Sequence, residues 1–192
     1  MNTRCSYGID HSRFNDSHAQ IKGGAVYYDL YRPQLINNTH HNNTAQYGNN
    51  IASYPIKIRH ADSNQNTTRN VLSNVVSGQV HSPSLQFDLV DHDDQIILTD
   101  SSSTIKINKI DDDTSVDGVK AVVVSQGSAS FDEVIFKAKP GSSNVMFEVT
   151  STAINNDILM LQYNGTAYDN NLNISFRYCE SGEVEVNDQC RV

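Results

Sequence analysis

Apolar and polar residues alternate through much of the second half of the chain. In "SLQFDLVD" (84–91), the apolar residues Leu85, Phe87 and Leu89 are separated by Gln86 and Asp88. This period of two indicates antiparallel strands that bury one face. The other strand-like stretches are 54–59, 95–100, 104–110, 120–126, 129–138, 144–151, 158–164 and 172–179.

Turn-forming runs such as "DDDTSVDG" and "KPGSSN" separate these stretches. Short strands at this spacing predict an antiparallel β-sandwich over residues 81–192. The polar, aperiodic stretch 61–80 is expected to be a linker or loop. No stretch of useful length has a period of 3.6 residues, so we expect very little helix.

The first 60 residues follow a different pattern. The stretches "NDSHAQIKGGAV" (15–26) and "NNTAQYGNNIA" (42–52) share the dipeptide Ala-Gln, and Ala19 and Ala45 lie 26 residues apart. Short apolar patches at such a period, with Gly and Asn between them, predict a short parallel β-helix of two to three coils over residues 1–60. The Asn residues would form its left-handed corners and stack into amide ladders. The fold class we expect is therefore all-β.

The motifs "GGAV" (23–26) and "NNTAQYGNNIAS" (42–53) also resemble a known family. They are similar to the Gly-Gly-Ala-Ile and Phe-x-x-Asn repeats of the polymorphic outer membrane protein type β-helix, as found in very large ciliate surface proteins. His40 or His41 stands where that repeat usually carries Phe. The later "FRYCESGE" looks like the boundary before a Cys-rich region. The resemblance implies the C-terminal end of such a β-helix and a following β-domain, with an extracellular structural or adhesive role and no catalytic residues.

Composition narrows the range of partners. The net charge is −8 and the basic residues do not cluster, so the electrostatic field repels nucleic acid and anionic membrane surfaces. No stretch approaches the roughly 20 apolar residues of a membrane span. The first residues lack the apolar stretch that forms the core of a signal peptide. We therefore expect no nucleic-acid partner and no membrane span in this segment.

Glycosylation sequons and cysteines indicate an extracellular protein, secreted or at the cell surface. If so, Met1 is not the native start, and the chain is a mature fragment or one piece of a longer polypeptide. N-linked glycans are expected at six Asn-x-Ser/Thr sites: Asn15, Asn37, Asn42, Asn66, Asn164 and Asn173.

The three cysteines predict one disulfide and one remaining thiol. Turn signals between Cys179 and Cys190 allow these two residues to meet and form a disulfide. Cys5 is then left for an intermolecular disulfide, for a partner outside this segment or as a free thiol, and its pairing with Cys179 or Cys190 remains open. Spacing alone does not fix the connectivity.

Candidate chemistry is sparse. The acidic runs "DHDD" (91–94) and "DDD" (111–113) are interpreted as solvated turns, with calcium as the alternative. His40 and His41 are adjacent and so face opposite sides of a strand, which predicts no metal site there. No arrangement of Ser, His and Asp predicts a nucleophile, so we expect no catalytic residues and no enzyme. Tyr27, Tyr28, Tyr31 and Tyr47 are candidates for core packing or for stacking on a sugar.

These observations favour an extracellular structural glycoprotein. A coil stack needs neighbours or caps at its ends. We therefore expect self-association, head to tail into an oligomer or filament, or contacts with flanking domains of a longer chain. The first alternative is a carbohydrate-binding or adhesion module of a larger surface protein. The second is a polysaccharide-active enzyme.

Overall fold

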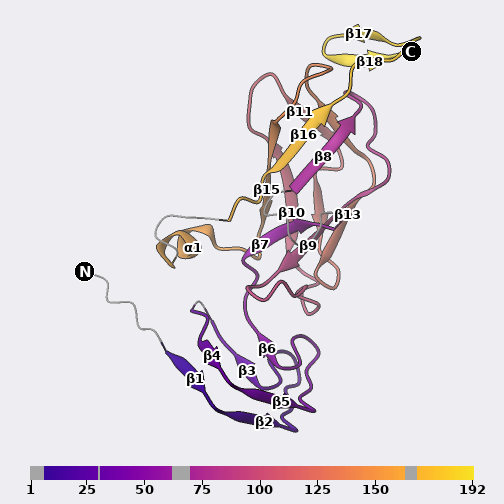
Figure 1. Ribbon diagram of the computed structural model, residues 1–192. Helices are drawn as coiled ribbons and strands as arrows, with labels where there is room; N and C mark the ends of the chain where they lie inside the picture. Colours follow the sequence, from indigo (N-terminus) through magenta and orange to yellow (C-terminus); the bar gives the residue numbers. More distant parts are fainter. Residues whose placement is uncertain (1–6, 30, 62–69, 163–167) are drawn as a thin grey trace.

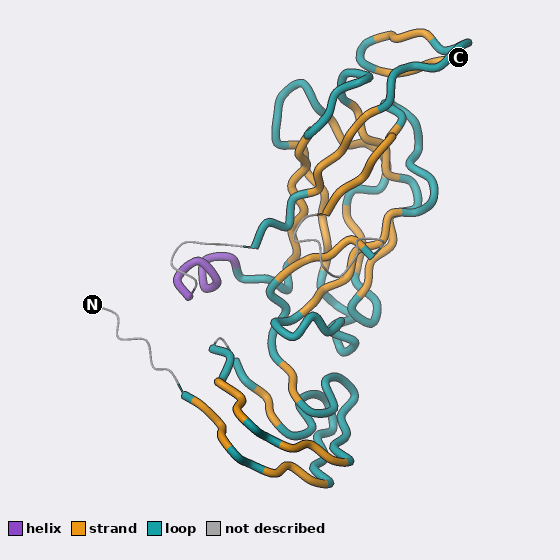
Figure 2. The backbone as a smooth tube through the Cα atoms, viewed as in Figure 1, coloured by secondary structure: helices purple, strands orange, loops and turns teal. Residues whose placement is uncertain are grey.

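The computed structural model describes residues 7–29, 31–61, 70–162 and 168–192. Within these residues the protein consists almost entirely of β-strands, with one short helix, α1 (Asn156–Gln162). Figure 1 shows β1 to β6 at one end of the molecule and the hairpin β17–β18 at the opposite end. Figure 2 shows that loops and turns connect most of the strands. The predicted all-β class is confirmed.

The first six strands form parallel pairs between two consecutive stretches of chain, the first segment (residues 7–29) and the second segment (residues 31–53), together called the paired segments. β1 (Gly8–Asp10) pairs with β4 (Gln34–Ile36), β2 (Arg13–Asn15) with β5 (Thr39–His41), and β3 (Val26–Tyr27) with β6 (Ile51–Ala52). Partners such as Gly8 and Gln34 differ by 26 in residue number, and Val26 and Ile51 by 25. The repeat seen in the sequence is therefore a spatial register.

The corners of the paired segments are also in register. Residues with positive φ follow one another at this spacing, and Asn, Asp and Gly adopt such a backbone at low cost. The paired corner residues are His11 (φ 46°) and Asn37 (50°), Asp16 (51°) and Asn42 (51°), and Gly23 (67°) and Gly48 (62°). The expectation that Asn occupies corners therefore agrees with the backbone at two positions.

The predicted amide ladder takes a different form. The Asn38 Oδ1 accepts from the Ser12 amide (2.9 Å), and its Nδ2 donates to the Ile9 carbonyl (2.8 Å). Asn43 repeats this arrangement with the Ser17 amide (3.0 Å) and the Phe14 carbonyl (3.1 Å). The amides bridge to backbone because Ser, not Asn, stands 26 residues earlier at both positions.

The remaining strands form the sheet region (residues 57–61, 70–162 and 168–192), whose largest sheet has five strands. Its order is β12-β10-β15-β16-β8, and the pair β16–β8 is parallel. β8 lies within 61–80, which we expected to be linker or loop. The bounds are β8 Asn70–Val75, β10 Thr104–Lys109, β12 Ala121–Val123, β15 Val145–Ser151 and β16 Leu172–Phe176.

Smaller sheets complete this region. A three-stranded sheet has the order β13-β9-β7, and β11 pairs with β14. The apolar core includes Phe136 of β14 and Phe147 of β15, whose ring centroids lie 5.0 Å apart, so β14 packs on the five-stranded sheet through these rings. The bounds are β7 Lys57–His60, β9 Leu85–Val90, β11 Ser115–Gly118, β13 Ser128–Phe131 and β14 Val134–Lys137.

Four local predictions differ from the structure. The stretch 129–138, expected to be one strand, divides between β13 and β14, which belong to different sheets. The stretch 158–164 was expected to be a strand, but α1 covers most of it, because the Asn155 side chain caps the helix by accepting from the Ile158 amide (3.1 Å). The stretch 95–100 forms turns, with one isolated bridge between Val90 and Ile96. The run 111–118, expected to be a turn, contains β11, which is paired with β14.

Candidate functional site: the ends of the paired segments

The loop of residues 91–95, called here the Asp91 loop, joins the sheet region to the paired segments. Asp91 is fully buried and accepts hydrogen bonds from four donors. These are the Tyr47 hydroxyl, the Asp93 amide (2.8 Å), the Gln95 amide (3.0 Å) and the Gln95 Nε2 (3.1 Å). Gln95 Nε2 also donates to the Ile51 carbonyl of β6 (3.0 Å). The loop therefore covers the β6 side of the second segment.

The other carboxylates of this loop also have protein partners. Asp93 accepts from the Tyr28 hydroxyl (2.9 Å) and from Arg32 (2.6 Å). Asp94 binds Lys57. The run "DHDD", which we interpreted as a solvated turn, therefore connects the two parts of the molecule, and its carboxylates face protein donors.

Burial of Tyr28 and Tyr47 has the largest effect on the pKa of their hydroxyls. It raises the pKa of each above the ordinary value of 10.0, and the neighbouring Asp93 and Asp91 carboxylates raise it further. Only a protonated hydroxyl donates to a carboxylate. Two of the four tyrosines considered for sugar stacking are thus structural donors.

The second acidic run is bound locally. Asp112 forms an ion pair with Lys109 (2.9 Å), and the Asp111 carbonyl accepts from the Thr114 hydroxyl (2.9 Å). Asp111, Asp113 and Asp188 line a shallow pocket. Among the residues that the structure describes, three potential metal-binding side chains come close together at a different place, in the group Cys179, Glu183 and Cys190.

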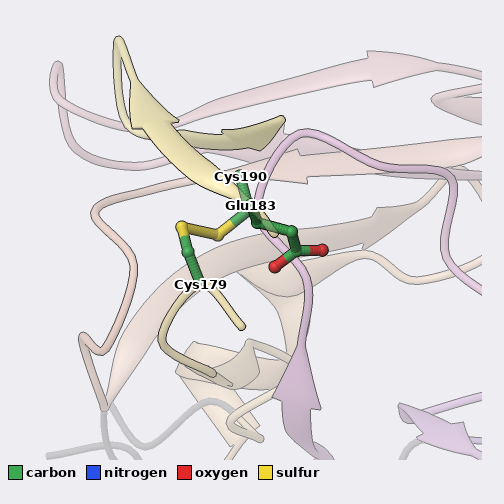
Figure 3. A group of neighbouring side chains, drawn as sticks. All are labelled: Cys179, Glu183 and Cys190. Carbon is green, nitrogen blue, oxygen red and sulfur yellow. A yellow bond between two sulfur atoms is a disulfide. The ribbon is translucent and has the colours of Figure 1, made fainter. Parts of the chain in front are cut away.

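That group is a structural element at the C-terminal end of the described chain (Figure 3). Cys179 and Cys190 form a disulfide, as predicted, so neither sulfur is available as a thiolate. Arg177 binds Glu183 through two hydrogen bonds (2.7 and 2.8 Å) and lowers the pKa of that carboxyl to about 2. The disulfide tethers the hairpin of β17 (Val184–Val186) and β18 (Gln189–Arg191).

The histidine pair separates as expected for adjacent strand residues. The His40 ring stacks on Phe14 of the first segment, with centroids 5.2 Å apart and planes 9° apart, whereas His41 is exposed. His40 therefore takes the ring position in the second segment that Phe14 takes in the first. Its Nδ1 is buried and has no hydrogen-bond partner among the residues that the structure describes.

The described sequons differ in accessibility. Asn15, Asn37 and Asn42 are exposed and lie at the ends of the β2–β5 pair. Asn173, by contrast, is half-buried in β16, and its Nδ2 donates to Asn144 (3.4 Å). Cys5, Asn66 and Asn164 lie outside the described residues.

The first segment has an open edge. Within the described residues, β1, β2 and β3 each pair with one strand, in the second segment. Ile9 and Phe14, in the middle of β1 and β2, are only half-buried. A strand edge with unpaired backbone groups is a template for another strand. The first segment can therefore accept a further parallel strand layer.

A pocket lies where the paired segments meet α1. Its volume is about 320 Å³, and its lining is mainly apolar: Asp29, Tyr54, Pro55, Ile56, Ala153, Asn155, Ile158 and Leu159. Tyr54 contacts Tyr27 edge to face, with centroids 5.8 Å apart, and its hydrogen bond with Tyr27 raises its pKa. Lys22 Nζ lies 4.5 Å from the Tyr27 ring centroid and 4.8 Å from that of Tyr54. The sequence analysis did not select Tyr54, because it lies outside the repeated motif.

Comparisons with protein-family models, with curated proteins and with solved structures found no match to this chain. In the part of the chain that the structure describes, α1 is too short to cross a membrane, and no other helix is present.

Proposed function

We propose that the protein is an extracellular structural glycoprotein, in which the paired segments are two coils of a parallel β-helix and the sheet region is a β-sandwich that caps one end of it. The observation that carries the proposal is the 26-residue register, in which strands and left-handed corners repeat together. Stacked coils of this kind bury their interior only against neighbours. The disulfide and the exposed sequons support the extracellular location.

The open edge of the first segment is the proposed assembly surface. Its occupant is a further coil of the same period, continuous with the first segment and thus part of a longer polypeptide. A second copy stacked head to tail would have to place its coil over β6, where Gln95 already binds the Ile51 carbonyl. This contact favours an added coil over the head-to-tail filament expected from the sequence.

An extension experiment tests the proposal. A copy of residues 8–33 is inserted before Gly8, so that the added coil is in register by 26 residues. The control insert lacks three residues of that copy, which breaks the register. Hydrogen exchange of the β1 and β2 amides, thermal unfolding and sedimentation are measured for both extended chains and for the unextended chain.

The in-register insert is expected to slow exchange in β1 and β2 and to raise the unfolding temperature, while the protein stays monomeric. Equal effects of the two inserts would refute the added coil. Filaments of the unextended chain, with disulfide-linked dimers on non-reducing gels, would favour self-association instead.

A further inference from the structure

The pocket between the paired segments and α1 has the features of a ligand site. Its volume, about 320 Å³, is at the lower end of the usual range for small-molecule sites, roughly 300–1,000 Å³. Such sites combine an apolar lining with a few polar groups. Here Pro55, Ile56 and Leu159 provide apolar lining, and Asp29, Tyr54 and Asn155 provide polar groups.

One polar group of the pocket makes no hydrogen bond or ion pair with the described part of the protein. Asp29 is exposed, and within the described part of the chain its carboxylate has no hydrogen bond or ion pair. This contrasts with Asp91, Asp93 and Asp94, which all bind protein donors. A carboxylate left free at the rim of a pocket is an acceptor for donors of a ligand.

The aromatic side of the pocket is exposed as well. Tyr54 is 44% exposed and Tyr27 is 39% exposed, although they contact each other. Lys22 adds a positive charge beside the two rings. The charges of Lys22 and Asp29 have opposite sign, so this surface does not select strongly for a charged ligand. It does offer both a donor and an acceptor for hydroxyl groups.

Three of the sequons leave this surface uncovered. Asn15, Asn37 and Asn42 lie around the β2–β5 pair, whereas Tyr27 belongs to β3 and Tyr54 follows β6. Glycans at those three sites would be attached to a different pair of strands from the one beside the pocket. These three glycans would therefore leave the pocket accessible.

We infer that this pocket is a carbohydrate-binding site for a neutral pyranose. The C–H face of the sugar packs on Tyr54 and the aliphatic lining. Hydroxyl groups of the sugar donate to Asp29, whereas Lys22 lies outside the pocket lining, over the Tyr54 ring. The inference is independent of the coil extension, because it involves neither β1, β2 nor the open edge.

The test uses the intact chain and neutral disaccharides. Cellobiose, lactose, chitobiose and mannobiose are titrated separately by NMR or calorimetry, and sorbitol serves as a polyol without a pyranose ring. Tyr54→Ala and Asp29→Asn are the test variants. Tyr31→Ala is the matched control, because Tyr31 is also 44% exposed but does not line the pocket. Circular dichroism confirms that each variant is folded.

At least one disaccharide is expected to bind, and sorbitol is not. Each test variant should weaken binding about tenfold or more, since each removes the aromatic face or a charged hydrogen-bond acceptor. Tyr31→Ala should bind like the original chain. The inference is overturned if no disaccharide binds, if sorbitol binds equally well, or if Tyr31→Ala weakens binding as much as Tyr54→Ala.

Discussion

Asp91 is predicted to be the residue on which attachment of the paired segments to the sheet region most depends. Replacing it with alanine removes the acceptor of four hydrogen bonds at a fully buried position. The Tyr47 hydroxyl is buried and would lose its hydrogen bond to Asp91, which costs about 1–3 kcal/mol. The backbone amides of Asp93 and Gln95 are partly buried, and each adds about 1 kcal/mol. We expect Asp91→Ala to destabilise the protein by about 3–5 kcal/mol.

Two further variants separate the contributions. Tyr47→Phe removes one donor and should cost about 1–3 kcal/mol. In combination with Asp91→Ala it should add little, because the hydroxyl has already lost its hydrogen bond to Asp91 and keeps only a long one, 3.5 Å, to the Ser53 carbonyl. Asp94→Asn is the control in the same loop, since Asp94 is 49% exposed, pairs with Lys57 at the surface and has a φ of 59°, which Asn adopts more readily than Ala. Its expected cost is below about 1 kcal/mol.

Urea unfolding followed by far-ultraviolet circular dichroism measures these differences, because the chain contains no Trp for fluorescence. Hydrogen exchange locates the effect and should show faster exchange in β3 and β6 first. If Asp91→Ala and Asp94→Asn shift the unfolding midpoint equally, or if the Asp91 and Tyr47 effects add fully, the proposed buried network is wrong.

Four other outcomes follow from the structure. The raised pKa of Tyr47 contributes stability that is fully present below pH 10.0, the pKa in the unfolded chain, and is lost as the pH rises above it. The free energy of unfolding, measured as a function of pH, should therefore fall at alkaline pH. The lowered pKa of Glu183 contributes stability above pH 4.5 that is lost as the pH falls toward about 2, which exchange of the β17–β18 amides should report. Replacing both half-cystines by serine should cost about 2–3 kcal/mol, and an unchanged unfolding midpoint would contradict this. Gly24→Ala should disrupt the paired segments and lower the temperature of thermal unfolding, because its Cβ would lie 2.1 Å from the Asn49 carbonyl oxygen. Gly8→Ala should leave that temperature unchanged, because the nearest contact of its Cβ would be at 3.4 Å.

Local patterns predicted much of the fold. The alternation around Leu85, Phe87 and Leu89 identified β9, and all three residues are fully buried. The 26-residue repeat, together with Gly and Asn at its ends, anticipated the register of the first two strand pairs. The disulfide between Cys179 and Cys190 followed from nearby turn signals, and Asn187 and Asp188 do form the hairpin turn, with φ of 50° and 59°. These features depend on neighbouring residues or on a regular spacing, which a single sequence displays.

Contacts between distant residues were not predictable in the same way. Nothing near β8 indicated a parallel partner about 100 residues later, so residues 70–75 looked like part of a loop. The helical cap supplied by Asn155 outweighed the strand-like apolar run that follows it.

By itself, the sequence indicated the β-rich character of the chain, the 26-residue register of the pairs β1–β4 and β2–β5, and the disulfide between Cys179 and Cys190. The tertiary structure decided what the polar side chains do. Asp91 and Asp29 are both acidic residues flanked by tyrosines or turns in the sequence, yet one is fully buried and the other is exposed at a pocket. The reason is that burial and hydrogen-bond partners come from packing between strands and loops that are remote in the sequence. The residues next to a carboxylate in the sequence do not show which donors it will meet in the fold.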